Sequence, residues 1–224
     1  HDPGTALQND FGYTPIYLHY NTGLNITNNG EQFSNLLEEL SQAWPVAIEE
    51  IVIVAHSMGG LVTRSAHYHA GELAHTWPAL TQKIVFLGTP HHGAVLERGG
   101  HWFDTLLGST PYAAPFAKIG KIRSAGITDL RYGYILDDDD VPVPLPKKIQ
   151  CFTIAGTTST DGDTLHGDGL VQINSALGVH EDEKLSLAFP KRQQFVLLAT
   201  NHIQLLGAES AYIAIKKCIA MPNK

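Results

Sequence analysis

Short apolar runs and stretches of helical spacing alternate along the chain. The apolar runs are of the kind that lie inside a parallel sheet, and they predict strands at 14–20, 49–55, 83–89, 149–156 and 194–200. Apolar residues at helical spacing predict helices over 28–44, 57–71 and 203–219. Strands that alternate with helices predict an α/β fold, in which a mostly parallel sheet is covered by helices on both faces.

Local signals predict where two of these helices begin or end. Asn28, with Glu31 three residues later, forms a capping-box pattern at the start of the first helix, and Pro45 closes that helix. Gly71 is a plausible C-cap of the second helix.

Residues 90–146 interrupt this alternation with a stretch rich in proline and glycine. We interpret it as an insertion, similar to a cap or flap, within a single domain that spans 1–224. Its large apolar side chains either pack as a cap or line an acyl pocket as a flap, and both readings stay open. The candidate substrate-binding residues in it are Trp102, Phe103, Leu106 and Leu107.

A serine follows the strand 49–55 in the string AHSMGG. Ser57 stands two residues past that strand and opens a helix, a turn so tight that its flanking residues must be small, as Ala55 and Gly59 are. Alanine stands here where glycine is usual. The helix start also offers the N–H of Met58 to a developing oxyanion. Serine is a common N-cap as well, but the strand and helix around it favour a nucleophile.

A serine nucleophile needs a base, and a histidine follows the last predicted strand. His202 stands two residues beyond 194–200 and just before the final helix, where this architecture places the base. His56, directly before the serine, is interpreted as a structural residue that faces away along the turn.

The acid that orients the histidine is expected after the strand 149–156. The loop there holds Asp161, Asp163 and Asp168. We favour Asp168 because GDGLV places it between glycines and beside an apolar anchor, whereas the other two are typical of turns and solvated loops. The resulting chain order of serine, aspartate and histidine is the order that α/β-hydrolases use.

These segments resemble a known family over almost the whole chain. AHSMGG, FLGTPHHGA, GDGLV and NHIQLL are similar to the nucleophile, following-strand, acid and histidine segments of bacterial α/β-hydrolases of the lipase and carboxylesterase type, near the PGAP1-like esterases. GYTPIYLHYNTG and NNGEQFSNLLEEL resemble the strand and helix that precede the elbow. The resemblance implies a Ser57–His202–Asp168 triad, an acyl-enzyme and no cofactor.

The same resemblance implies that part of the fold precedes this sequence. The family's second oxyanion donor comes from a loop after a strand beside the elbow strand, whereas 14–20 resembles the strand after that one. We therefore expect the sequence, which begins with His1, to start after the oxyanion loop and the strands before it. The chain is then a fragment, or another chain supplies the missing part, or 14–20 pairs directly with 49–55.

Composition narrows the class of partner. With 224 residues, 43% of them hydrophobic and 17% charged, the chain is typical of one soluble globular domain. No apolar run is long enough for a membrane span, and a net charge of −7 argues against nucleic acid and anionic membrane surfaces as partners. We expect a small hydrophobic ester as substrate. The sequence does not indicate the oligomeric state.

Histidines, acidic residues and cysteines give no recognisable metal site. His91 and His92 lack ligand spacing with a carboxylate, and the acidic run 137–140 lacks the alternation of a calcium loop, so we expect neither a metal nor a cofactor. Cys151 and Cys218 are interpreted as two separate buried thiols, with a single bridge as the alternative. The compartment is therefore undecided, with a cytoplasmic location favoured.

We interpret the chain as a serine carboxylesterase or lipase. The alternatives are an acyltransferase on the same scaffold, in which an alcohol or amine replaces water, and a catalytically silent binding protein with the hydrolase fold.

Overall fold

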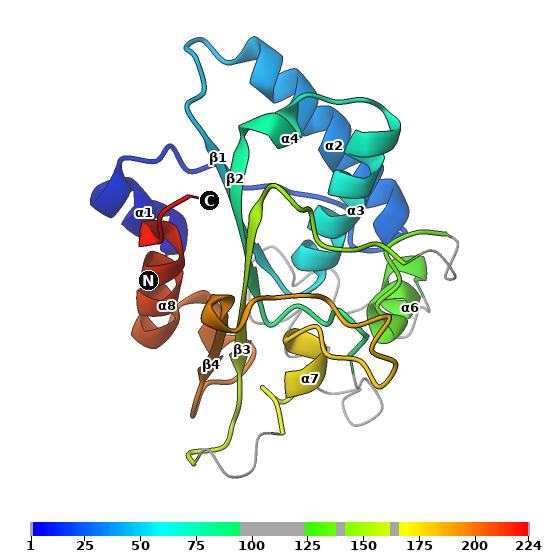
Figure 1. The fold of residues 1–224 in the computed structure, drawn as a ribbon, viewed down its shortest axis with the longest axis vertical. Helices are drawn as coiled ribbons and strands as arrows, with labels where there is room; N and C mark the ends of the chain where they lie inside the picture. The colour runs from blue at the N-terminus through cyan, green and yellow to red at the C-terminus, as the bar shows by residue number, and fades with distance from the viewer. Residues whose placement is uncertain (1, 95–123, 138–141, 162–165, 224) are drawn as a thin grey trace.

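The computed structural model describes residues 2–94, 124–137, 142–161 and 166–223. In this part of the chain four strands form one sheet in the order β1-β2-β3-β4, and each neighbouring pair is parallel (Figure 1). The strands are β1 (Ile51–His56), β2 (Thr81–Leu87), β3 (Gln150–Gly156) and β4 (Gln194–Leu197). Four of the five predicted strands are thereby confirmed, with ends shifted by a few residues.

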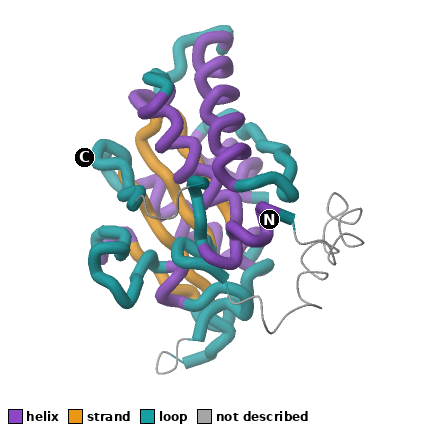
Figure 2. The backbone as a smooth tube through the Cα atoms, turned by 90° about the vertical axis from the view of Figure 1, so that its right-hand side faces the viewer, coloured by secondary structure: helices purple, strands orange, loops and turns teal. Residues whose placement is uncertain are grey.

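Helices lie on both sides of the sheet, as the alternation predicts. Figure 1 shows α1 and α8 on one side and the remaining α-helices on the other, and Figure 2 shows the strands between helical layers. The helices and 3₁₀ turns are α1 (Pro3–Phe11), α2 (Ile26–Ala43), α3 (Met58–Glu72), α4 (Trp77–Leu80), α6 (Ala125–Tyr132), α7 (Ile173–Ala176), η3 (Lys191–Gln193), η4 (Gln204–Leu206) and α8 (Glu209–Ala220). The predicted final helix is thus two pieces, η4 and α8, with Gly207 between them. None of the helices in the described ranges is both long and apolar enough to cross a membrane.

The two central strands, β2 and β3, bury side chains on both faces of the sheet. One face packs against α1 and α8, and its buried residues include Val85, Leu87, Phe152, Ile154 and Ile215. The other face packs against the loops before η3, and its buried residues include Ile84, Phe86, Cys151, Leu187 and Phe189. This two-sided burial explains why these strands read as continuous apolar runs.

Neither Cys151 nor Cys218 forms a disulfide bond in the structure. Cys218 belongs to the cluster on the α8 face, whereas Cys151 belongs to the cluster on the opposite face. The sheet therefore separates the two thiols, and the alternative of a bridge between them is wrong.

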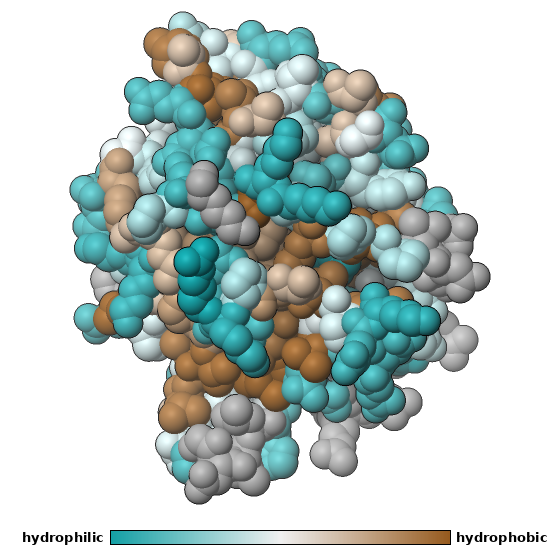
Figure 3. All heavy atoms as spheres, viewed as in Figure 1, coloured by the Kyte–Doolittle hydropathy of each residue, from teal (hydrophilic) through white to brown (hydrophobic). Residues whose placement is uncertain are grey.

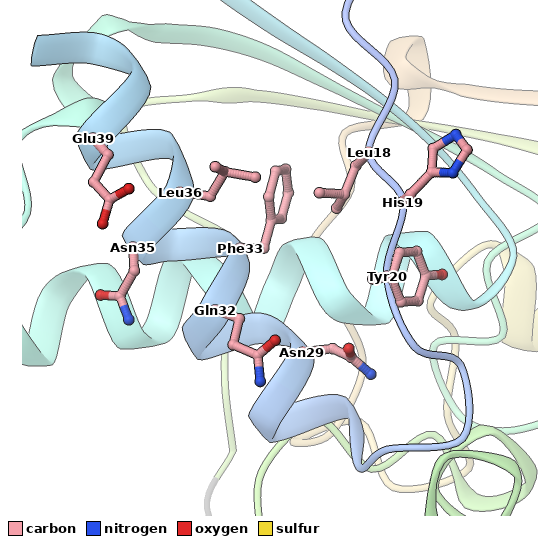
Figure 4. A pocket seen from close by; sticks show the side chains of 9 residues that line it. All are labelled: Leu18, His19, Tyr20, Asn29, Gln32, Phe33, Asn35, Leu36 and Glu39. Carbon is pink, nitrogen blue, oxygen red and sulfur yellow. The ribbon is translucent and has the colours of Figure 1, made fainter. Parts of the chain in front are cut away.

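The predicted strand at 14–20 is absent. This segment has no regular secondary structure, and β1 is the edge of the sheet, paired with β2 alone among the described residues. In Figure 4, Leu18 points toward Phe33 of α2 while His19 points away, and a cavity of 350 Å³ lies between the segment and the helix. Leu18 thus meets a helix instead of a neighbouring strand, Ile16 and Tyr17 are exposed, and direct pairing with 49–55 does not occur.

The helix start predicted at Asn28 is also wrong. α2 begins at Ile26, whose N–H donates to Asp129 Oδ2 of α6 at 2.8 Å, and the N-cap Asn25 makes no side-chain cap. A carboxylate from the far end of the insertion thus satisfies the first turn of α2. In the same way Gly71 is not a cap, because α3 continues to Glu72.

The described end of the insertion returns to the main body of the molecule. Leu130 of α6 and Ile135 join a buried cluster with Ile26, Met58 and Leu61, which come from α2 and α3. The cap-like character of 90–146 remains a prediction, because most of the segment lies outside the described residues.

One part of the surface seen in Figure 3 is apolar. A brown area covers the lower part of this face, where β4 lies in Figure 1. Val196, Leu198 and Leu206 are exposed by 37%, 44% and 38%. Of these, Leu198 precedes and Leu206 follows His202 in the sequence.

Candidate active site

The turn from β1 to α3 holds Ser57 in a strained backbone conformation. Its φ is 53° and its ψ is −126°, in a region that costs a non-glycine residue about 1–3 kcal/mol. The Ser57 N–H donates to the Leu87 carbonyl at 2.9 Å, which fixes the serine against the end of β2. A Cβ on Gly60 would lie 2.1 Å from Thr89 Oγ1, so α3 begins in close contact with the chain after β2. A small residue is therefore required at Gly60, whereas a Cβ on Gly59, the position singled out in the sequence, would make only an ordinary contact of 3.8 Å with the Tyr20 hydroxyl.

The start of α3 points free backbone donors along the helix axis. Met58 is the first residue of α3, and the first N–H groups of a helix have no acceptor within it. These donors, together with the helix dipole, favour negative charge beside Ser57.

Asp168 and His202 form a fully buried pair. His202 Nδ1 donates to Asp168 Oδ2 at 2.7 Å, and the two side chains are 1% exposed or less. The other carboxylate oxygen, Oδ1, accepts the N–H groups of Leu170 at 3.0 Å and Val171 at 2.8 Å. The His202 N–H also donates to the Asp168 carbonyl at 3.1 Å. Side chain and backbone together fix the ring so that Nε2 is the nitrogen left to accept a proton.

The structure thus pairs His202 with Asp168 and not with the other candidate acids. Asp161 is exposed and accepts a hydrogen bond from Ser159, whereas Asp163 lies outside the described residues. The glycines on either side of Asp168 allow the backbone conformation that directs this aspartate toward His202. Gly167 and Gly169 have φ values of 110° and 97°, and a Cβ on Gly167 would lie 2.1 Å from the Val171 carbonyl oxygen.

Gly88 connects the serine turn to the acid–histidine pair. Gly88 directly follows Leu87, whose carbonyl accepts the Ser57 N–H, and the φ of Gly88 is 52°. A Cβ there would lie 2.9 Å from Asp168 Oδ2 and 3.1 Å from His202 Nδ1. The end of β2 therefore touches the serine turn on one side and the buried pair on the other.

His56 faces the same pair, contrary to the expectation that it points away along the turn. Its Nε2–H donates to the His202 carbonyl at 2.9 Å, and the centroids of the two rings are 4.5 Å apart. Burial, and next the neighbouring His202 ring, lowers the pKa of His56 to about 3, so the ring is neutral near pH 7. Its role is still structural, but it acts directly on the backbone of His202.

Among the described residues, His202 Nε2 is buried without a hydrogen-bond partner. It is the atom that a triad uses to accept the serine proton. Ser57, Asp168 and His202 follow β1, β3 and β4 along the chain, and open α/β sheets bind their ligands beyond the carboxyl ends of their strands. The structure joins His202 to Asp168, whereas the His202 ring makes no hydrogen bond to Ser57.

Sequence reasoning missed the contributions of Gly88 and His56. The signal for Gly88 was a glycine directly after a buried strand, and the signal for His56 was its place beside the serine. The candidate substrate-binding residues Trp102, Phe103, Leu106 and Leu107 lie outside the described residues. Within the described ranges, no three His, Cys, Asp or Glu side chains are grouped so as to hold a metal ion.

A family model described as the PGAP1-like alpha/beta domain matches residues 9–159. The chain belongs to this family. The matched residues of this PGAP1-like chain include Ser57 and the first three strands, whereas Asp168 and His202 lie beyond them.

Solved structures show the same fold. The mature lipase BlEst2 of Bacillus licheniformis superposes with a TM-score of 0.58 at 19% identity, over 92% of this chain and 78% of the lipase chain. A structure described as a thermophilic esterase gives a TM-score of 0.50 at 16% identity, over 89% of this chain and 73% of the esterase chain. No curated protein matches the sequence. These likenesses assign the α/β-hydrolase fold to the PGAP1-like chain.

Proposed function

We propose that this PGAP1-like chain is a serine carboxylesterase of the lipase type. The observation that carries the proposal is the contact of Gly88 with the buried Asp168–His202 pair, directly beside the Leu87 carbonyl that holds the strained Ser57. A merely capping serine needs neither a left-handed backbone nor a buried histidine nearby.

The reaction follows the two-step course of a serine esterase. Ser57 Oγ attacks the ester carbonyl carbon while His202 Nε2 takes its proton, and the carbonyl electrons move onto the oxygen. The Met58 N–H donates to that oxyanion. When the carbonyl re-forms, the bond to the leaving alcohol breaks and His202 returns the proton to it. Water then attacks the acyl-enzyme by the same route and releases the carboxylic acid and Ser57.

Asp168 and His56 hold His202 from two sides. Asp168 keeps the Nδ1–H tautomer and stabilises the imidazolium that forms during each step. The neutral His56 binds the His202 carbonyl, which fixes the backbone that carries the base. His56 is therefore a positioning residue, because it acts through His202.

A hydrophobic ester suits the exposed apolar side chains on the segments before and after His202. The exposed Leu198 and Leu206 lie on either side of His202 in the sequence, and apolar side chains bind acyl chains by excluding water. The names of the structural neighbours, a lipase and an esterase, agree with such a substrate.

The test is hydrolysis of p-nitrophenyl butyrate by the chain, its Ser57→Ala variant and a Ser41→Ala control on α2. We expect Ser57→Ala to lower kcat by roughly 10³-fold or more and Ser41→Ala to leave it unchanged. Equal turnover by all three proteins would exclude Ser57 as the nucleophile.

A serine-directed phosphonate separates the enzyme from a silent scaffold. We expect one adduct per chain, on Ser57, and none in Ser57→Ala. An unlabelled chain would instead support a hydrolase-fold binding protein. Product analysis with added alcohols then separates hydrolysis, which yields the free acid, from acyl transfer, which yields a new ester.

A further inference from the structure

A second group of polar side chains lines a cavity of 480 Å³ that contains no member of the proposed triad. Its basic lining comes from α3, from the segment after β2 and from the loop before η3. These residues are Arg64, His91, His92, His180 and Lys184. Among the described residues, the lining includes no aspartate or glutamate, in a chain whose net charge is −7.

Arg64 is a buried cation without a carboxylate partner in the described ranges. It is 8% exposed, and its Nη2 donates to the Val143 carbonyl at 2.8 Å. Its Nε is buried with no acceptor among the described residues. Burial lowers the pKa of Arg64 to about 10, so the guanidinium is charged at neutral pH. A buried charge without a partner is costly, and an anion in the cavity would offset that cost.

His91 and His92 bring further unused polar atoms to the same cavity. His91 is 2% exposed, and neither of its ring nitrogens has a hydrogen-bond partner in the described structure. Its ring packs against Phe86 and Phe189 at centroid distances of 4.9 Å and 5.4 Å. His92 Nε2 is likewise buried and unpartnered there. Even a neutral imidazole keeps one N–H to donate, so both rings suit an acceptor ligand.

Much of the remaining lining is apolar or aromatic. Tyr132 and Tyr134 stack with ring centroids 5.2 Å apart and an interplanar angle of 21°. Both line the cavity together with Leu136, Pro144 and Leu185. The volume exceeds what a bare oxyanion fills and falls in the range of small-molecule sites.

We propose that this cavity binds a small organic anion, whose carboxylate or phosphate group meets Arg64, His91 and His92 while its apolar part lies against the tyrosines. The planar guanidinium matches the oxygens of either group in a two-point contact. Lys184, at the exposed side of the cavity, adds positive charge for such a ligand. The inference is independent of the proposed esterase activity, since it uses none of the triad residues.

Isothermal titration of the Ser57→Ala chain with phenyl phosphate and with phenylacetate tests the site and identifies the head group. We expect at least one of the two to bind, and the tighter one shows which head group the cavity selects. Added Arg64→Met should weaken that binding by tenfold or more, whereas Arg192→Met, at an exposed position outside the cavity, should leave it unchanged. Failure of both ligands to bind, or equal binding by the Arg64→Met variant, overturns the proposal.

A second variant and a second measurement keep the test decisive even if Arg64→Met fails to fold. Lys184→Met changes an exposed residue of the lining and should weaken binding several-fold. In histidine-labelled protein, the anion should shift the ring signals of His91 and His92 but not those of His69, which pairs with Thr27 outside the cavity. Unmoved His91 and His92 signals would contradict the proposal.

Discussion

Two groups of buried polar side chains lie near the end of β2, and they differ in how their hydrogen bonds are satisfied. In the Asp168–His202 pair, both carboxylate oxygens and the ring Nδ1 are matched within the protein. Only His202 Nε2 is unmatched there among the described residues, and it is the atom proposed to take the serine proton. In the Arg64–His91–His92 group, four ring or guanidinium nitrogens are unmatched among the same residues.

This difference distinguishes buried polar groups whose hydrogen bonds are made within the protein from buried polar groups whose hydrogen bonds would be completed by a ligand. A buried donor or acceptor without a partner is expensive, so native proteins keep few of them, and those few call for an explanation. In the Asp168–His202 pair, hydrogen-bond partners within the chain offset the cost of burying the polar groups and fix their geometry. In the cavity, compensation would come from a ligand. Substitutions should therefore have different consequences in the two places.

The largest effect is expected from breaking the matched pair with Asp168→Asn. The amide would offer His202 Nδ1 a different hydrogen-bond pattern and could no longer stabilise the imidazolium, so we expect kcat to fall by roughly 10³–10⁴-fold. The measurement is kcat for p-nitrophenyl butyrate, with the exposed Asp161→Asn as the matched control. A loss of less than tenfold, or a similar loss in the control, would show that Asp168 is not the orienting acid.

An intermediate effect is expected from protonating the buried histidines. An unfolded imidazole takes up a proton near its usual pKa of 6.5, whereas folded His56, facing His202 and Asp168, does so only at about 3. The unfolded state therefore binds more protons as pH falls below 6.5, and the free energy of unfolding should fall through that window. Burial, and then the charge of Arg64, lowers the pKa of His91 as well, which adds to the same trend.

Urea unfolding at pH 8, 7, 6 and 5 measures this dependence. His56→Gln and His91→Gln should each flatten the curve, while His19→Gln, at an exposed position, should leave it unchanged. A slope that is the same in all four proteins would mean that other groups control acid stability. Sulfate should restore stability at low pH in the wild type more than in His91→Gln, because the anion favours a protonated ring in the cavity.

The sequence predicted the four strands that form the sheet and indicated three triad candidates, for one physical reason. Strands of a parallel sheet appear as short apolar runs, and functional residues in such sheets lie just after these runs. Ser57, Asp168 and His202 could therefore be located from the ends of the strands. The left-handed glycines around Asp168 reinforced that choice locally.

Contacts between residues that are far apart in the sequence could not be predicted. Residues 14–20 have the apolar pattern of a strand, but whether a strand forms depends on a neighbour, and here the neighbour is a helix. The start of α2 is capped by Asp129, which no local pattern indicates. The burial of Arg64 likewise depends on segments distant in the sequence, since its Nη2 donates to the Val143 carbonyl and its charge acts on His91.

The smallest effect on stability is expected at the unmatched group, from Arg64→Met in a buffer free of oxyanions. The variant loses the hydrogen bond to the Val143 carbonyl, worth about 1 kcal/mol, but it also removes an uncompensated buried charge. The two contributions oppose each other, so we expect the free energy of unfolding to change by about 1 kcal/mol or less in either direction. Urea unfolding with and without the bound anion checks this, and only the wild type should gain stability when the anion is added. A loss of about 3 kcal/mol or more without any anion would mean that Arg64 is matched by the protein after all, and the contrast between the two groups would disappear.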